Sequence, residues 1–242
     1  MTTGKPTELN YNPQLPLSQA LLLPRIAIED TTPVIDGGQF AVKAIEGQVV
    51  TVTSKVFADG HDRLAVRVRW RNDADECWQS EVMSNLGNNR WQGQFKVAAP
   101  GYYWFCIEAW LDPFATFCHE LEKKHLGGVS ISLELQEGRN LVQHASQRSE
   151  GAVSEALVAL HQELSGLLEA EQVALFVHPR SAALMAAADQ RPYISLSPEY
   201  PLDVERTRAQ FASWYELFPR SITDDPTGHG TFDDVHSRLP MA

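Results

Sequence analysis

The feature that most restricts the fold is a series of short strand-like segments, separated by turn residues at intervals of about ten residues. Residues 64–70 alternate in polarity, which predicts a half-buried antiparallel strand whose apolar face carries Leu64, Val66, Val68 and Trp70. Val49–Phe57 is rich in β-branched residues, and Tyr102–Trp110 is apolar on both faces, as a central strand would be. Further strands are expected at 80–83, 90–97, 114–117 and 129–135. We therefore predict a mainly β sandwich of the immunoglobulin or fibronectin type over residues 25–137.

A change of hydrophobic period from two to about 3.6 residues marks a second region after Gly138. One amphipathic helix is expected to carry an apolar stripe made of Val153, Leu157, Leu160, Leu164 and Leu167. Shorter helices are expected near 173–177 and over 181–189, the second one after the pair His178-Pro179. We assign residues 138–202 to a helical insert and an extended connector. This insert should be too small to bury its stripe alone, so we expect it to pack on the sandwich, on another domain or on a second copy of itself.

The two ends of the chain differ from both regions. Residues 1–24 are rich in Pro, Thr and Asn and are expected to be a mobile lead-in. Phe211–Ser221 predicts a strand and Thr231 a helix start, which together are half of a βαβ unit without a second parallel strand. Before them, either Asp203 caps a short helix over 204–212 or Leu202–Val204 forms a strand edge. The pattern leaves both choices open.

Composition excludes several classes of partner. A net charge of −11 at pH 7 argues against nucleic acid and against anionic membranes. No apolar run reaches the roughly 20 residues of a membrane helix, and the N-terminus has no apolar signal-peptide core. Cys77, Cys106 and Cys118 are an odd, widely spaced set without a Cys-x-x-Cys pair, which is typical of reduced thiols. We therefore expect a cytoplasmic protein.

Two histidine- or cysteine-containing groups invite a metal-site interpretation. Cys106, Cys118 and His119 could supply ligands to a metal ion, but we favour the interpretation that the cysteines are ordinary buried residues. His119 and His125 bracket a Glu-rich stretch, yet they are six residues apart, whereas a zinc-protease helix needs histidines at i and i+4. We favour a charged, solvated turn at this place.

Acidic and aromatic clusters are the other candidates. Asp73, Asp75 and Glu76 resemble the opening of a calcium loop, but Trp78 stands where that loop needs glycine, so an acidic hairpin turn is favoured. A possible base or ligand cluster at a strand end consists of Asp59, His61 and Asp62, although Asp59-Gly60 is first of all a turn. A sugar-stacking platform could be formed by Trp70, Trp78, Trp91, Trp104 and Trp110, which are otherwise core residues. We assign no catalytic, cofactor-binding or metal-binding residue.

Eight motifs, taken in their order, resemble the N-terminal region of the bacterial α-1,4-glucan:maltose-1-phosphate maltosyltransferases, which are enzymes of the glycoside-hydrolase-family-13 type. They are RIAIED (25–30), DGGQFAVK (36–43), VFADGHD (56–62), LGNNRW (86–91), EAWLDPFAT (108–116), ELEKK (120–124), WYELFPRS (214–221) and HGTF (229–232). Three positions depart from the family pattern: Asn89 replaces Asp, Pro113 replaces Arg or Lys, and Phe117 replaces Trp. Residues 138–200 match in helical character alone.

The resemblance implies a retaining transferase that adds maltosyl units from α-maltose 1-phosphate to an α-1,4-glucan, with an aspartate nucleophile and a glutamate acid/base on a TIM-like barrel. The catalytic pair of the family comes from later barrel strands, so neither role is transferred to a residue of this chain. Residues 211–221 and 231–242 would be the first strand and helix of a barrel whose start, 203–242, is incomplete. Glu216 and Arg220 would support its wall.

We therefore expect a non-catalytic, structural or dimerisation region of such an enzyme, inactive by itself and without a cofactor. Its sandwich and helical insert are expected to form a homodimer interface, and the α-glucan and maltose 1-phosphate would be ligands of the parent enzyme. Two alternatives stay open. The chain could be a carbohydrate-binding β-sandwich module of another α-amylase-family enzyme, or an interaction module that dimerises through the Leu-rich helix 152–169.

Overall fold

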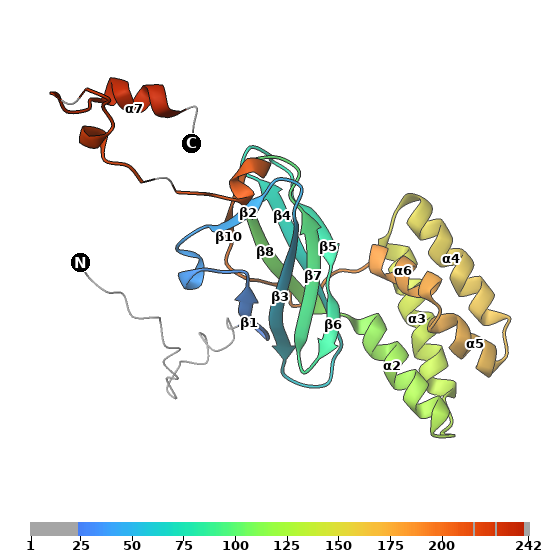
Figure 1. The fold of residues 1–242 in the computed structure, drawn as a ribbon. Coiled ribbons are helices and arrows are strands. Elements are labelled where there is room, and N and C mark those ends of the chain that lie inside the picture. The colour runs from blue at the N-terminus through green and yellow to red at the C-terminus, as the bar shows by residue number, and fades with distance from the viewer. Residues whose placement is uncertain (1–23, 215, 226, 240–242) are drawn as a thin grey trace, which may run out of the picture.

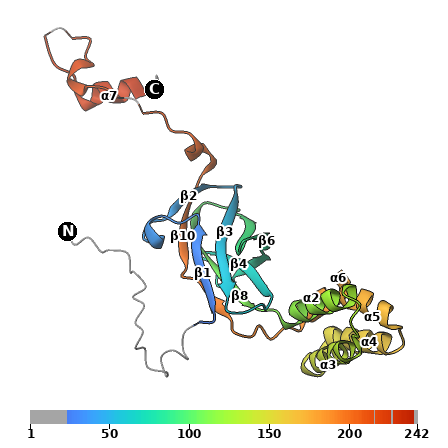
Figure 2. The ribbon, with the colours of Figure 1, turned by 90° about the horizontal axis from the view of Figure 1, so that it is seen from below.

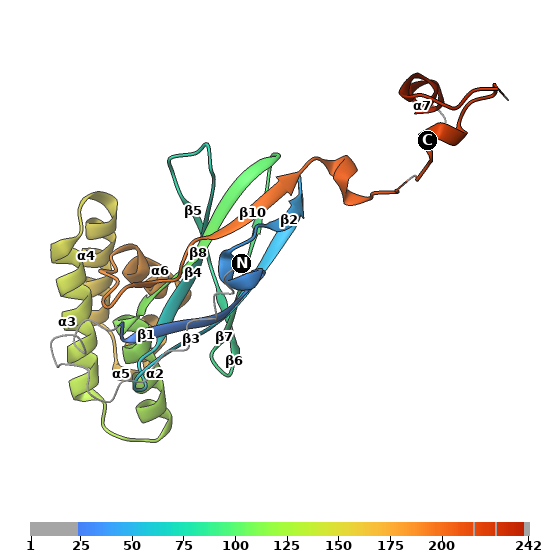
Figure 3. The same cartoon turned by 90° about the vertical axis from the view of Figure 1, so that its left-hand side faces the viewer.

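The computed structural model describes residues 24–214, 216–225 and 227–239. Two facing β-sheets form one unit and a group of helices forms another, joined end to end (Figures 1 and 2). A C-terminal segment leaves the sheets at the end opposite to the helices (Figure 3). The lead-in predicted for 1–24 lies outside the described residues, apart from Pro24.

The smaller sheet has four strands in the order β1 (Ile26–Thr32), β3 (Val49–Ala58), β7 (Arg90–Lys96) and β6 (Ser84–Gly87). All of its neighbouring strands are antiparallel.

The larger sheet has six strands. Its main order is β2 (Val42–Ile45), β10 (Tyr200–Glu205), β8 (Gly101–Leu111), β4 (Leu64–Asn72) and β5 (Gln79–Val82). The short β9 (Ser195–Leu196) also pairs with β8. β10 runs antiparallel to β8 and parallel to β2, so the last strand of the unit lies between an early strand and a middle one.

The alternation read from the sequence places the core between the two sheets. Val66 and Val68 of β4 are fully buried, and their cross-strand partners Ala109 and Ile107 of β8 are also fully buried. Arg67 and Arg69 point to the outer face of the larger sheet, because successive side chains of a strand alternate between faces. The predicted strand over 64–70, the predicted central position of 102–110 and the predicted sandwich-like packing of two sheets are confirmed.

Two predicted strands are wrong, because residues 114–117 and 129–135 belong to helices α2 (Pro113–Leu126) and α3 (Ser132–Arg148) or to the turn between them. Asp112 caps α2 by accepting a hydrogen bond from the Ala115 backbone nitrogen at 2.8 Å, and proline occupies the first helical position. Phe114, Phe117 and Leu121 then share one buried helical face. The helices therefore begin at residue 113, and the expected boundary at 137/138 falls inside α3.

The helical unit continues with α4 (Gly151–Ser165), α5 (Glu169–Phe176) and α6 (Pro179–Ala187). The stripe residues Leu157, Leu160 and Leu164 have no exposed surface and belong to a core that the helices form among themselves, in which α4 contacts mainly α3 and α6. The prediction that this stripe needs a partner from outside is therefore wrong. The same core also contains Phe114, Phe117 and Leu121 of α2, a helix that the sequence did not predict. None of the described helices is long and apolar enough to cross a membrane.

The segment after residue 205 contains little regular structure. Leu202–Val204 lies in strand β10, which decides the choice left open by the sequence, and a 3₁₀ turn follows at Thr207–Gln210. Phe211–Ser221 forms no strand in its described residues and ends in a 3₁₀ turn at Pro219–Ser221, so the predicted strand is not present in this structure. The predicted helix start at Thr231 is confirmed by α7 (Phe232–Arg238), where Asp234 accepts from the Thr231 nitrogen at 2.7 Å.

Candidate functional site

The three cysteines lie apart from one another. Cys106 is buried on the outer face of β8, where burial raises the pKa of its thiol to about 11. Cys118 lies on α2 with its sulfur 3.5 Å from the Phe176 carbonyl oxygen, and burial raises its pKa to about 12. Cys77 is exposed. The described residues contain no group of three or more His, Cys, Asp or Glu side chains arranged to hold a metal ion, so neither the Cys106–Cys118–His119 set nor the His119–His125 pair forms a site.

The acidic clusters have structural partners. Asp73 accepts a hydrogen bond from the Trp104 indole nitrogen at 2.9 Å, in the hairpin turn where Asp75 and Glu76 also lie. Asp59 forms an ion pair with Arg25 at 3.3 Å. These contacts agree with turn and surface roles for both carboxylates.

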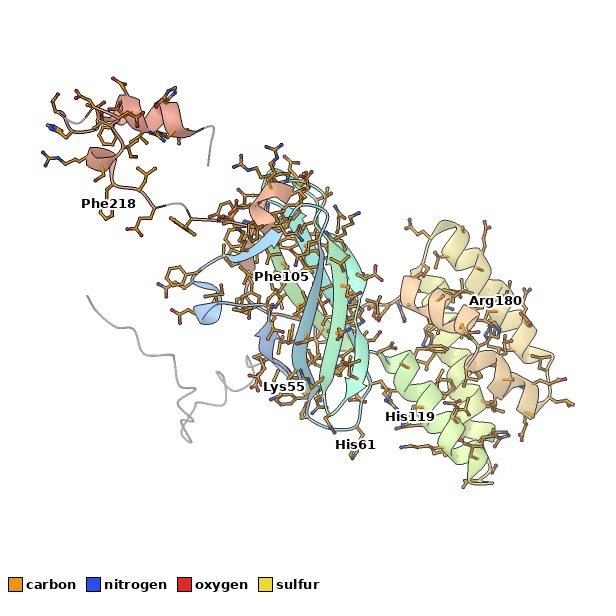
Figure 4. All side chains as sticks on the ribbon, viewed as in Figure 1. Lys55, His61, Phe105, His119, Arg180 and Phe218 are labelled. Carbon is orange, nitrogen blue, oxygen red and sulfur yellow. The ribbon has the colours of Figure 1, made fainter. Side chains whose placement is uncertain are left out.

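His61 and Asp62 diverge from Asp59 and line a cleft between the two units. The cleft has a volume of about 1010 Å³, and its walls come from the β3–β4 loop, the β6–β7 turn, α2 and α6. Figure 4 shows His61 at the end of the sheets and His119 on α2, on the two sides of this region. The predicted cluster of Asp59, His61 and Asp62 is therefore not one site, but two of its members lie where the units meet.

Arg63 and His119 are in contact at the cleft. The Arg63 Nη2 atom lies 2.9 Å from the ring nitrogens of His119. Burial, followed by the positive charges of Arg63 and Lys123, lowers the pKa of His119. Neutral His119 can therefore accept the guanidinium hydrogen bond near pH 7. Burial raises the pKa of Asp112, the cap of α2, against the opposing effect of its backbone hydrogen bonds.

The five tryptophans proposed as a sugar platform are divided between two faces. Trp70 stacks on Phe95 with ring centroids 4.8 Å apart, and the Trp91 indole nitrogen donates to the Val56 carbonyl oxygen, so both point into the sandwich. Trp78, Trp104 and Trp110 lie on the outer side of the larger sheet. A single platform of five rings does not exist.

The outer face instead carries interleaved arginine and tryptophan side chains. Guanidinium groups of Arg67 and Arg191 lie 5.6 and 5.2 Å from the Trp110 ring centroid. Those of Arg69 and Arg71 lie 5.1 and 5.2 Å from the Trp78 ring. Such cation–π contacts cover the flat ring surfaces that a sugar would need.

Glu108 is the negative centre of this face. It is 3% exposed, pairs with Arg67, and has Arg69 and Arg191 at 3.6 and 3.8 Å. We call Arg67, Arg69, Arg191, Glu108 and Trp110 the arginine–tryptophan cluster. Sequence reasoning missed it, although the alternation of arginines on β4 opposite Glu108 and Trp110 on β8 was a readable signal. Its contacts are mutual and strengthen the sheet; they present no nucleophile paired with a base.

Glu216 and Arg220 are exposed, as are the aromatic residues Trp214 and Phe218. Phe211, Trp214 and Phe218 have 82%, 96% and 72% of their surface exposed, and Phe232 has 83%. An isolated folded segment rarely exposes so many large aromatics, so the surface is typical of a segment that packs against further protein.

Comparison with known proteins identifies the family. The sequence model for domain N/S of α-1,4-glucan:maltose-1-phosphate maltosyltransferase matches residues 24–206. Relatives carrying that enzyme name include those of Pseudomonas aeruginosa (39% identity) and Burkholderia pseudomallei (41%), each matched over 93% of this chain, and of Chlorobaculum tepidum (34%, over 89%). The chain spans 34%, 20% and 32% of the length of these three relatives. The chain therefore belongs to the α-1,4-glucan:maltose-1-phosphate maltosyltransferase family, through the N/S domain of that family.

Proposed function

We propose that this chain is the non-catalytic N-terminal region of a maltosyltransferase that elongates α-1,4-glucan from maltose 1-phosphate. The observation that carries the proposal is the family match over residues 24–206, on a chain that spans a fifth to a third of the named relatives. The retaining chemistry then requires an aspartate and a glutamate on a barrel outside these residues. The role of this chain is to support and position that barrel in a cytoplasmic enzyme.

The organisation that we propose has three parts. Residues 25–111 and 195–205 form an immunoglobulin-like sandwich, and residues 113–190 are a helical insertion into it. Residues 207–239 are the first strand–helix unit of the barrel, which takes its strand form when the neighbouring strands cover Phe211, Trp214 and Phe218. Their exposure in this structure supports that role.

We also propose that the parent enzyme is a homodimer built through the sandwich and the helical unit. The Leu-rich stripe of α4 cannot be the contact, because its leucines are buried within the unit. The alternative of a module that dimerises through this stripe is therefore abandoned. Sedimentation of the chain at several concentrations tests the dimer, and a monomer at every concentration would count against it.

The activity test uses the chain and the full-length protein side by side. The chain should transfer no maltosyl group from maltose 1-phosphate to maltohexaose, whereas the full-length protein should release phosphate and lengthen the acceptor. Transfer by the chain alone would overturn the non-catalytic assignment. An inactive full-length protein would overturn the proposed reaction.

Carbohydrate binding by the sandwich is a second candidate function, favoured by the cleft rather than by the tryptophans. The lining includes the exposed side chains of Asn85, Asn89 and Phe57, which offer two amides and an aromatic ring. Its carboxylates outnumber its cations by five to three, which favours a neutral sugar over a phosphorylated one (Asp62, Asp112, Glu120, Glu122 and Asp189 against Arg63, Lys123 and Arg148). Calorimetric titration with maltoheptaose should give heat that Asn89→Ala reduces. Asn88→Ala is the control, because Asn88 is exposed in the same turn and also has a positive φ but does not line the cleft. No heat at millimolar sugar would exclude this function.

A further inference from the structure

The helical unit is joined to the sandwich by two neighbouring chain crossings. The chain leaves β8 at Leu111 to enter α2, and it returns from α6 through residues 188–194 to reach β9. The two crossings are tied to each other, since the Leu111 backbone nitrogen donates to the Pro192 carbonyl oxygen at 3.1 Å. Figures 1 and 2 show the helices attached at this narrow place and standing beyond the end of the sheets. A joint of this shape allows one body to rotate against the other.

The apolar cores of the two units are separate. Among the described residues, the core of the sandwich and the core of the helices share no member. The contacts near the first crossing are polar: the Arg63 nitrogen donates to Thr116 Oγ1 at 2.8 Å, and the Asp112 nitrogen donates to the Arg63 carbonyl oxygen at 2.8 Å. Polar interfaces between two bodies of one chain permit relative motion as a rule.

A compact set of contacts spans the second crossing. Asp189, just after α6, accepts a hydrogen bond from the Trp110 indole nitrogen of β8 and one from the Arg191 backbone nitrogen at 3.0 Å. Arg191 lies over the Trp110 ring and reaches Glu108. Arg191 and Tyr193 hold positive φ angles of 50° and 56°, a strained backbone that such side chains seldom adopt without surrounding contacts. We call Trp110, Asp189 and Arg191 the clasp.

We propose that the helical unit turns about this joint, and that the clasp holds it at one angle and thereby sets the width of the cleft between the units. Asp189 and Gln190 line the cleft directly, so movement at the clasp changes its wall. Trp110 and Arg191 position Asp189, because both donate hydrogen bonds to its carboxylate. The inference concerns this chain alone and is independent of the proposed enzyme reaction.

The test measures the distance between the units in solution. Spin labels are attached to Lys96→Cys on β7 and Glu155→Cys on α4, two exposed positions, in a Cys77→Ser background. Double electron–electron resonance then gives the distribution of distances between the two labels. Mass spectrometry verifies that these two positions alone carry labels. In the parent chain one narrow distribution is expected. Asp189→Ala should at least double its width, while Asp189→Asn, which keeps a carbonyl acceptor for Trp110, should remain close to the parent.

The chain supplies a matched control within the same sheet. Asp73 accepts from the Trp104 indole nitrogen as Asp189 accepts from Trp110, but both partners belong to the sandwich. Asp73→Ala should leave the distribution unchanged. If Asp189→Ala lowers the helix content, Trp110→Phe replaces it as the test, since phenylalanine keeps an aromatic ring and loses the N–H donor. An unchanged width in the folded variant, or equal broadening by Asp73→Ala, would overturn the proposal.

Discussion

The sandwich and the helical unit solve the burial of their cores in opposite ways. The helices follow one another in the chain and pack on near neighbours, with α3 against α4 as the largest helical contact. The sandwich is interrupted by all of those helices and becomes complete when β10 enters between β2 and β8. The helical unit is therefore local in sequence, whereas the sandwich depends on a strand that is made after its insertion.

The largest effect should come from removing that late strand. A chain that ends at Ile194 lacks β9 and β10, including the buried Leu202 and Val204, whose burial is worth about 1.5–3 kcal/mol each. We expect the amide spectrum to lose the dispersed sandwich signals and keep the helical ones. The control is a chain that ends at Arg206, which keeps β9 and β10 and should show the signals of both units. A folded sandwich in the shorter chain would refute the late-strand dependence.

Removal of the charge at the centre of the arginine–tryptophan cluster should have the next largest effect, mainly on the sandwich. Glu108→Ala leaves three arginines without their carboxylate, and breaking a buried pair costs about 3–5 kcal/mol. The cost should fall at the low end, because Arg67 and Arg69 keep 18% and 24% exposure and are partly solvated. Urea unfolding measures it. Glu81→Ala, at an exposed position of β5, should change stability by less than about 0.5 kcal/mol.

A smaller effect, limited to the helices, is expected at Gly138 of α3. A Cβ atom there would lie 2.3 Å from the Phe117 ring and 2.7 Å from the Phe176 ring. Gly138→Ala should destabilise the helical unit by about 1–3 kcal/mol through overpacking, despite the better helix propensity of alanine. Thermal unfolding followed at 222 nm measures this loss. Gly166→Ala, where the nearest atom would be 3.8 Å away, is the matched control and should cost little.

The smallest effect is a pH dependence located between the units. The pKa of His119 is lower in the folded chain than in the unfolded one, because burial and the charges of Arg63 and Lys123 oppose its protonation. The unfolded chain therefore binds a proton first as the pH falls, so stability is lost from about pH 6.5 downward. His119→Gln should flatten this part of a stability–pH curve. An unaltered slope would show that His119 does not contribute.

Sequence reasoning succeeded where one strand face is apolar and the other is polar. Val66 and Val68 were placed correctly because alternation fixes which face a strand buries. It failed at Phe114–Phe117, where two aromatics in four residues fit either a strand or a helix, although Asp112 and Pro113 are together a helix-start signal. It could not place β10 beside β2, since strand pairing across an insertion leaves no local pattern.

The candidate sites were less accessible to sequence reasoning than the fold. Asp59 and His61 are two residues apart, yet Asp59 pairs with Arg25 while His61 faces the cleft. Conversely, Trp110 and Asp189 are distant in sequence and meet through a hydrogen bond. Residues that are close in sequence need not share a site when they lie in a turning loop. The contacts that join the two units depend on tertiary packing and leave no local sequence pattern.

The hydrogen bond between Leu111 and Pro192 has a consequence for the evolution of such a protein. The two ends of the insertion are only one backbone contact apart, so the helices occupy the position of a long hairpin loop between β8 and β9. A loop at such a site can be lengthened, shortened or exchanged without altering the distance that the flanking strands must bridge. The helical unit therefore lies where another insertion could replace it while the strands of the sandwich stay unchanged.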